Sequence, residues 1–159
     1  MINDALRQEL QAMRNEDLRV RAELVASGEL GGEYVPRMED VHKRNASRLR
    51  ELIDLHGWPS EDMAGKDGCE AAWLIAQHAI LQPEFQRSCL KFLAEAAREH
   101  TVPLWQPAML EDRIRVFENR PQLYGTQLKP DAHGNPRPHA IEDRERVDER
   151  RRAVGLESR

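Results

Sequence analysis

Polar residues interrupt four of the apolar helical patterns in this sequence, and they are the first candidates for chemistry. Each interruption falls where the spacing of apolar residues predicts a core-facing position. They are Asp17, Asn45, the pair Gln77 and His78, and Arg113. A buried polar side chain needs a hydrogen-bond partner, because burial without one costs free energy. If the helices form one bundle, these residues can meet in its core, which is a usual place for a functional site.

His78 is the centre of the predicted site. The pKa of an imidazole beside a carboxylate and a guanidinium can be tuned, so that it transfers protons near neutral pH. In this hypothesis Asp17 or Asp112 orients the imidazole, and Arg113 binds an anionic group of the substrate. The sequence therefore predicts a small enzyme that performs acid–base chemistry on a small-molecule or peptide ligand.

A non-catalytic interaction protein, such as an immunity or regulatory partner, is the alternative. In that interpretation the polar residues form a structural network and the charged surface does the binding. Asp17 then lies at a solvated edge and pairs with Arg21, four residues further along the helix. Asn45 satisfies a backbone group, and Arg113 extends to solvent. The sequence leaves both interpretations open.

The segment that positions His78 is the most apolar one in the chain. Residues 70–82 read EAAWLIAQHAILQ, and this run leaves no polar face. A helix that is hydrophobic all round is a buried helix, and this one is too short to span a bilayer. We therefore expect a central helix over residues 67–81, with Asp67 as its N-cap after a loop at 63–68.

Amphipathic patterns predict the remaining helices. They cover residues 3–27, 38–56, 83–99 and 104–118, and a charged helix with i to i+4 ion pairs covers 142–154. Asn3 is the expected N-cap of the first helix. Tyr34 and Val35 are expected to pack back onto the core from the loop over 28–36. His42 and His56 lie near the edges of the second helix's apolar face, and we interpret them as structural or solvated.

The segment after residue 119 loses helical periodicity. Residues 122–128 have strand character, 129–137 are rich in turn residues, and 138–141 can return as an edge strand. The predicted fold class is therefore mainly α: a single-domain bundle of five to six helices over residues 1–159, with a small β-like hairpin near the C-terminus.

Composition limits the classes of partner. The chain has 159 residues, 33% of them charged, and a formal net charge of -4. This balance gives no reason to expect a nucleic-acid partner, because such proteins usually carry a basic patch. The start of the chain has no apolar signal segment, so we expect a cytoplasmic protein with no membrane partner. Cys69 and Cys89 lie in or beside apolar patterns and are expected to be buried thiols.

Several blocks of sequence resemble DUF6624, a bacterial family of unknown function, over nearly the whole chain. The blocks are GWP at 57–59, AAWLIAQHA at 71–79, Gln86, EDR at 111–113, QLYGTQ at 122–127 and RRRAVGL at 150–156. The resemblance implies that the QHA, DR and YGTQ residues belong to the family pattern. The family usually has an acid directly after QHA, whereas this chain has Ile80. The resemblance implies where the site lies rather than which reaction it performs.

The YGTQ block, residues 124–127, has a physical reading of its own. Tyr124, Thr126 and Gln127 offer uncharged hydrogen-bonding groups, and Gly125 lets the backbone approach a ligand closely. This block can cover a polar pocket beside His78, or it can be a hairpin whose polar groups bond the backbone. The candidate residues are catalytic His78, Asp17 and Asp112, and substrate-binding Arg113, Gln77, Tyr124, Gln127 and Asn45.

Other chemistries have weaker support. The sequence has no Gly-rich phosphate loop, no HExxH, no Cys pair at zinc spacing and no G-x-S-x-G. His78 with Asp17 or Asp112 could hold one metal ion, but no pair of ligands close in sequence supports it, so no metal ligand is assigned. Cys89 is disfavoured as a nucleophile because it lies on an apolar stripe. The cofactor, the substrate and the oligomeric state do not follow from the sequence.

Overall fold

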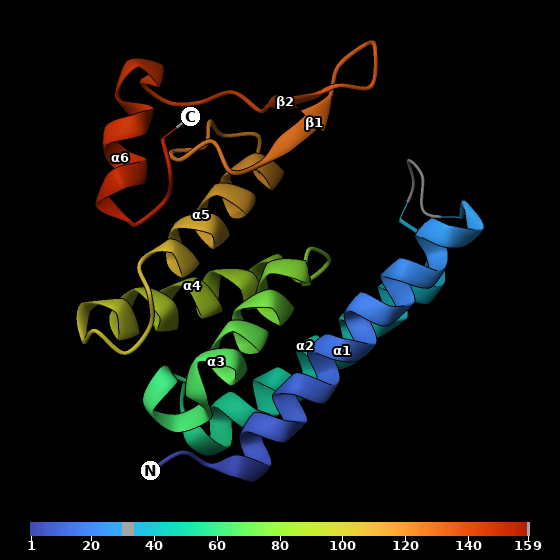
Figure 1. Cartoon of the computed structure of the whole chain (residues 1–159), viewed down its shortest axis with the longest axis vertical. Helices are drawn as coiled ribbons and strands as arrows, with labels where there is room; N and C mark the ends of the chain where they lie inside the picture. The colour runs from blue at the N-terminus through green and yellow to red at the C-terminus, as the bar shows by residue number, and fades with distance from the viewer. Residues whose placement is uncertain (30–33, 159) are drawn as a thin grey trace. The chain divides into compact units, whose positions relative to one another are not determined.

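The computed structural model describes residues 1–29 and 34–158, and this part of the chain is mainly helical, as predicted. It contains six α-helices and a two-stranded antiparallel hairpin near the C-terminus (Figure 1). The chain divides into two compact units, Met1–Phe85 and Gln86–Arg159, and each is described by itself.

The first unit is built on a pair of helices, α1 (Asp4–Ser27) and α2 (Pro36–His56), which lie side by side (Figure 1). Their cross-contacts show that the pair is antiparallel. Arg37 meets Glu23 near the connection between the helices, and Arg48 meets Glu9 further away. The pairing therefore brings the middle of α1 next to the middle of α2, where Asp17 and His42 lie.

Local sequence signals place the ends of these helices. Asn3 is the N-cap of α1, as predicted, and its side chain accepts a hydrogen bond from Leu6 N at 3.1 Å. Helix α2 begins at Pro36, two residues before the predicted start, because proline is compatible with the first turn of a helix. Tyr34 and Val35 pack against the core, as expected. Of the expected loop over 28–36, residues 30–33 lie outside the described part.

Helix α3 (Glu61–His78) differs from the predicted central helix at both ends. The loop predicted over 63–68 is wrong: the segment is helical except at Gly65, whose φ of 75° and ψ of 167° kink the helix. Asp67 is therefore not an N-cap, and its carboxylate accepts hydrogen bonds from the Arg7 guanidinium instead. The helix ends at His78, which makes the imidazole a side chain of the last turn rather than of the middle of a helix.

The core of the first unit lies where α1, α2 and α3 pack against one another. Apolar residues from all three helices are fully or almost fully buried there. They include Leu6, Leu10 and Leu24 of α1, Val41, Leu49 and Leu52 of α2, and Ala71, Ala72 and Ile75 of α3. This core fixes the register of the three helices and so positions the polar residues between them.

The second unit contains most of α4 (Pro83–Arg98), α5 (Trp105–Phe117) and a short C-terminal helix, α6 (Val147–Ala153). The hairpin pairs β1 (Leu128–Pro130) with β2 (Pro136–Pro138). The strands predicted over 122–128 and 138–141 are therefore wrong in position. Residues 122–127 form a loop instead, because several of their backbone N–H groups bond a side chain of α5 rather than a neighbouring strand.

The predicted C-terminal helix over 142–154 is shorter in the structure. A 3₁₀ turn (Arg144–Arg146) precedes α6. Two arginines of α6 bond backbone carbonyls rather than acids one turn away. Arg150 Nε donates to Leu123 O at 2.7 Å, and Arg151 donates through Nη1 to Tyr124 O, also at 2.7 Å. These arginines therefore hold the 122–127 loop.

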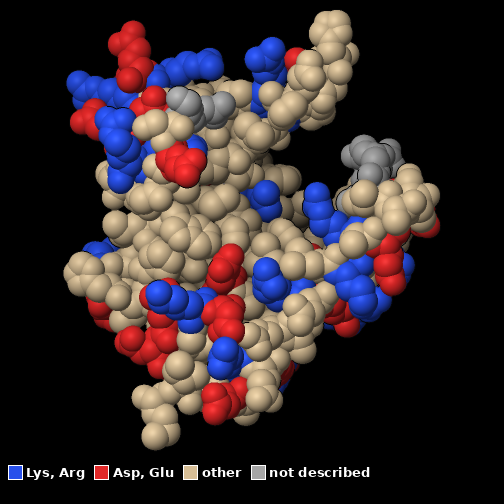
Figure 2. Space-filling view, viewed as in Figure 1, with Lys and Arg blue, Asp and Glu red and all other residues tan. Residues whose placement is uncertain are grey.

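The surface of the first unit carries charges of both signs. Ion pairs such as Arg19–Glu23 and Arg44–Asp40 cover α1 and α2. Figure 2 shows acidic and basic side chains interspersed on the visible face of this helix pair. Within the described residues, no helix is both long enough and apolar enough to cross a membrane.

Candidate functional site

Asp17 is the buried centre of the candidate site in the first unit. Its side chain, on α1, is only 1% exposed. Oδ2 lies 2.7 Å from Nδ1 of His78, in hydrogen-bonding contact. The solvated edge position considered for Asp17 is therefore wrong, and its partner is a histidine of α3 rather than the exposed Arg21.

His42 is a second histidine of the site, which the sequence analysis missed. Its Nε2 lies 3.2 Å from the same Asp17 oxygen, and its ring centroid lies 5.0 Å from that of His78. On the other side of the ring, His42 Nδ1 contacts the hydroxyl of Tyr34. We refer to Asp17, His42 and His78 as the His–Asp cluster.

A signal for His42 was present in the sequence. The positions Met38, His42, Asn45 and Leu49 follow one another in steps of four, three and four, so they share one face of α2. The other three residues are buried, and the side chain of His42 is 13% exposed. His42 is therefore more buried than a solvated residue at the edge of this face, and it contacts Asp17 and Tyr34.

The electrostatics of the cluster favour a charged carboxylate. Burial raises the pKa of Asp17, but the contacts with His42 and His78 outweigh burial, so the pKa lies below its ordinary value. Burial also raises the pKa of Tyr34 to about 12, assisted by the charges of Glu39 and Asp17. The phenol is therefore a neutral hydrogen-bonding partner for His42 near neutral pH.

The hydrogen bonding of the cluster is incomplete within the described residues. Asp17 Oδ1 is buried and has no hydrogen-bond partner there. His42 Nε2 is close to Asp17 Oδ2 but is not aligned for a hydrogen bond with it. Such buried groups are rare and often mark a functional site or a bound ion. The side chain of His78 is 18% exposed, so the predicted full burial is not confirmed and the cluster remains accessible.

The cluster has the chemistry of a proton-transfer site or a metal site. One ligand atom from each of Asp17, His42 and His78 lies within 4.8 Å of the others. A carboxylate that orients an imidazole is a frequent arrangement in acid–base catalysis. Two imidazoles and a carboxylate are also a common ligand set for first-row metals.

Two other predicted site residues lie in the first unit. Asn45 is buried on α2 and donates to Met13 O at 3.1 Å, which is the backbone-satisfying role considered from the sequence. Gln77 is buried on α3, directly before His78. Their predicted substrate-binding roles stay predictions.

Asp112 bonds the backbone of the 122–127 loop in the second unit. Its carboxylate accepts hydrogen bonds from Leu123 N, Tyr124 N and Thr126 N, and from the hydroxyl Oγ1 of Thr126. The distances lie between 2.7 and 3.2 Å. The side chain is fully buried on α5. This geometry favours a structural role, in which Asp112 folds the 122–127 loop, and its catalytic role stays a prediction.

The remaining predicted residues also lie on or near this loop. Arg113 Nε donates to Gln127 Oε1 at 2.9 Å. Gln122, which the sequence analysis did not single out, donates to the carbonyls of Gln127 and His139 and accepts from Gln127 N. The structure therefore joins Arg113 and Gln127 in one network. The predicted joint site of these residues with His78 spans both units and stays a prediction.

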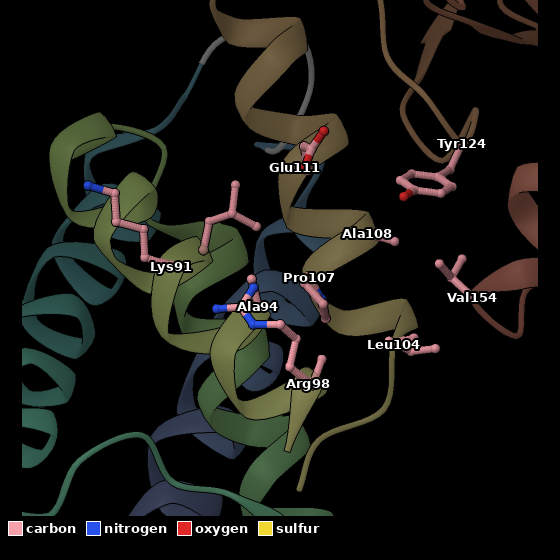
Figure 3. A pocket seen from close by; sticks show the side chains of 11 residues that line it. Lys91, Ala94, Arg98, Leu104, Pro107, Ala108, Glu111, Tyr124 and Val154 are labelled. Atoms are coloured by element: carbon pink, nitrogen blue, oxygen red, sulfur yellow. The ribbon is translucent and has the colours of Figure 1, made fainter. Parts of the chain in front are cut away.

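Tyr124 lines an apolar cavity of about 380 Å³ in the second unit. Figure 3 shows its ring on the same side of α5 as Ala108 and Val154. Burial raises the pKa of Tyr124, assisted by the charges of Glu111 and Asp112. The volume is within the range of small-molecule sites.

The chain belongs to DUF6624, described as a family of unknown function, whose model matches residues 4–158. No curated protein and no solved structure shows a significant match to the chain.

Proposed function

We propose that this chain is a small enzyme that performs acid–base chemistry at His78 on a small-molecule or peptide substrate. The observation that carries the proposal is the 2.7 Å contact between His78 Nδ1 and the buried carboxylate of Asp17. A carboxylate in this position fixes the tautomer and orientation of an imidazole and stabilises its protonated form. The other ring nitrogen of His78 is then the atom that exchanges a proton with the substrate.

Asp17 is the orienting acid in this proposal, in preference to Asp112. Asp17 contacts the imidazole directly, whereas Asp112 accepts bonds from the backbone of the 122–127 loop. Arg113, Tyr124 and Gln127 remain proposed substrate-binding residues, and the cavity beside Tyr124 supports a small ligand in that unit.

The proposal places the enzyme in the cytoplasm. Cys69 and Cys89 are buried thiols outside any disulfide, which is usual for a reducing compartment. It includes no membrane or nucleic-acid partner, which the net charge of -4 and the mixed surface charges support.

A non-catalytic interaction protein is the second candidate. The bonds of Asn45 to Met13 O, and of Asp112 to the 122–127 loop, favour it. In both cases a polar residue of the predicted site makes hydrogen bonds with backbone groups of its own unit, as a structural residue does.

The test is a search for turnover with purified chain, using a panel of esters, amides, phosphoesters and glycosides. We expect His78→Gln and Asp17→Asn to abolish the activity of the parent. His56→Gln, which changes an exposed histidine at the end of α2, should retain it. Full activity in folded His78→Gln would overturn the proposal, and no turnover by the parent would favour the interaction protein.

A further inference from the structure

We propose that the His–Asp cluster binds one first-row divalent metal ion, with Zn²⁺ as the reference ion. The ligands are a carboxylate oxygen of Asp17, Nε2 of His42 and Nδ1 of His78. This inference rests on the proposed function only for the location of the site. It goes beyond that function, because a bound ion, rather than His78, would activate a water molecule as the nucleophile.

The three ligand atoms are close enough for one ion if the two imidazoles move toward each other. Zinc lies about 2.0–2.2 Å from nitrogen and oxygen ligands, so ligand atoms in a tetrahedral site are separated by roughly 3.3 Å. In the structure Asp17 Oδ2 lies 3.2 Å from His42 Nε2 and 2.7 Å from His78 Nδ1. The ligand atoms of the cluster all lie within 4.8 Å of one another, so binding an ion would draw the two imidazole nitrogens together. The ligands come from α1, α2 and α3, so the packing of three helices brings them together.

The hydrogen bonding of the cluster is an independent observation that points to a cation. Asp17 is buried and its Oδ1 has no hydrogen-bond partner within the described residues. The nearby His42 Nε2 does not align with Asp17 Oδ2 for a hydrogen bond. A bound cation would satisfy both atoms, because it accepts the lone pairs of an imidazole and a carboxylate at once.

Tyr34 supplies the outer support that a metal-bound histidine needs. Its hydroxyl contacts Nδ1 of His42, which directs the other nitrogen, Nε2, toward Asp17. A histidine that binds a metal usually donates its second ring N–H to an oxygen acceptor, which fixes the ring and the tautomer. The phenolic oxygen of Tyr34 has lone pairs and lies in contact with His42 Nδ1, so it can accept that hydrogen bond.

Three protein ligands would leave at least one coordination position for water, as in catalytic zinc sites. A zinc ion lowers the pKa of its bound water to about 7. The nucleophile would then be metal-bound hydroxide, formed by transfer of one proton from that water to a solvent water molecule. In the loaded chain His78 is a ligand, and in the metal-free chain it is the base of the proposed function.

The first experiment measures binding of Zn²⁺ and Co²⁺ to chelator-treated, full-length chain by calorimetry and by the visible spectrum of Co²⁺. We expect one ion per chain and a higher melting temperature in its presence, because a ligand that binds only the folded state stabilises it. The absence of saturable binding by the parent would overturn the proposal, and this result needs no variant.

Variants then locate the ion. His42→Ala, His78→Ala and Asp17→Asn should each weaken binding by at least about tenfold, and Tyr34→Phe by about 10- to 100-fold as an outer partner. His56→Ala, on the same helix as His42, should bind like the parent. Circular dichroism identifies variants that are unfolded. Unchanged affinity in folded His42→Ala or folded His78→Ala would place the ion elsewhere and overturn the assignment.

Activity with and without chelator separates this inference from the proposed function. Turnover that survives complete metal removal, with no saturable metal binding, rejects the metal site and keeps acid–base chemistry at His78. Saturable binding at the cluster without any turnover keeps the metal site and rejects the enzyme.

Discussion

Asp17 and His78 carry the chemistry of this chain at the scale of single residues. A carboxylate that is 1% exposed keeps a pKa below its ordinary value because two imidazoles contact it, although burial by itself raises that pKa. Removal of one imidazole leaves less compensation for the buried charge. The cost of leaving such a group partly unsatisfied is about 1–3 kcal/mol.

The first prediction concerns His78→Ala in chelator-treated protein. The free energy of unfolding should fall by about 1–3 kcal/mol, because Asp17 loses its 2.7 Å partner. For a chain of this size each kcal/mol lowers the melting temperature by about 2–4 °C. Urea unfolding of the parent and variant gives the difference. His56→Ala is the control and should stay within about 0.5 kcal/mol, as exposed positions usually do. A variant more stable than the parent would contradict this prediction. It would indicate that the His–Asp cluster destabilises the folded chain, as functional sites often do.

At the scale of secondary-structure elements, the kink of α3 at Gly65 lies beside the ion pair that joins α3 to α1. Gly65 has a φ of 75° and a ψ of 167°, a backbone conformation that is essentially limited to glycine. A Cβ added there would lie 3.2 Å from Asp67 Oδ1 and 3.4 Å from Arg7 Nε. It would therefore press on the Arg7–Asp67 ion pair that joins α1 to α3.

The second prediction is that Gly65→Ala destabilises the chain by about 1–3 kcal/mol, through backbone strain and this crowding. Gly57→Ala is the matched control, because Gly57 has nearly the same backbone conformation, with a φ of 79° and a ψ of -173°, but its added Cβ meets nothing within 4 Å. Gly57→Ala should therefore cost less than Gly65→Ala. Chemical denaturation of both variants tests the order, and equal costs would show that the contacts at Gly65 contribute nothing.

The 122–127 loop depends on one side chain of α5. Asp112 accepts hydrogen bonds from three backbone N–H groups of this loop and from the Thr126 hydroxyl. The third prediction is that Asp112→Ala costs at least about 2 kcal/mol, because these buried donors lose a charged acceptor.

Hydrogen exchange shows which part of the chain is destabilised by Asp112→Ala. The amides of Leu123, Tyr124 and Thr126 should exchange much faster in Asp112→Ala, whereas those of α1 and α2 should change little. The nearby Glu118→Ala, which removes an exposed ion pair with Arg120, should leave the loop amides protected. Unchanged loop protection in Asp112→Ala would contradict the structural role of this carboxylate.

Carboxylates at or near the surface contribute to the acid response of the whole molecule. Arginine contacts lower the pKa of four of them, and backbone N–H groups, led by that of Asn135, lower the pKa of the fifth. They are Glu9, Glu23, Asp67, Glu118 and Asp131. For Asp67 the value falls to about 2, because Arg7 bonds its carboxylate. A group with a lowered folded-state pKa stabilises the chain above its unfolded pKa and loses that contribution in acid.

The fourth prediction is that the free energy of unfolding falls as the pH drops from about 5 to 2. The reason is that unfolded Asp and Glu titrate near about 3.9 and 4.3, above the lowered pKa values of the folded chain. Urea unfolding at several pH values, in the presence of chelator, measures how the free energy of unfolding depends on pH. High salt should make this dependence weaker, because exposed ion pairs are screened. Constant stability between pH 5 and 3 at low salt would show that the arginine contacts do not persist in solution.

Much of the helical architecture was predictable from the sequence. The apolar spacing predicted a helix over residues 3–27, and α1 spans Asp4–Ser27 with Asn3 as its cap. These features are local, since a helix repeats every few residues and its cap bonds a residue three positions away. The wrong predictions concern local features with a long-range cause. The predicted loop over 63–68 is a helix that kinks at Gly65 against Arg7. The strand predicted over 122–128 is instead a loop over 122–127 that bonds Asp112.

The sequence by itself also placed Asp17 within an apolar stripe and His78 in the most apolar segment of the chain, but it left open whether Asp17 is buried. Only the tertiary structure decided that they meet, across 61 residues of chain, and that His42 joins them. The physical reason is that helical periodicity fixes which face of a helix is buried, but not which residue of another helix lies opposite. That choice depends on the register in which α1, α2 and α3 pack, and the register is set by the many apolar contacts of the core together.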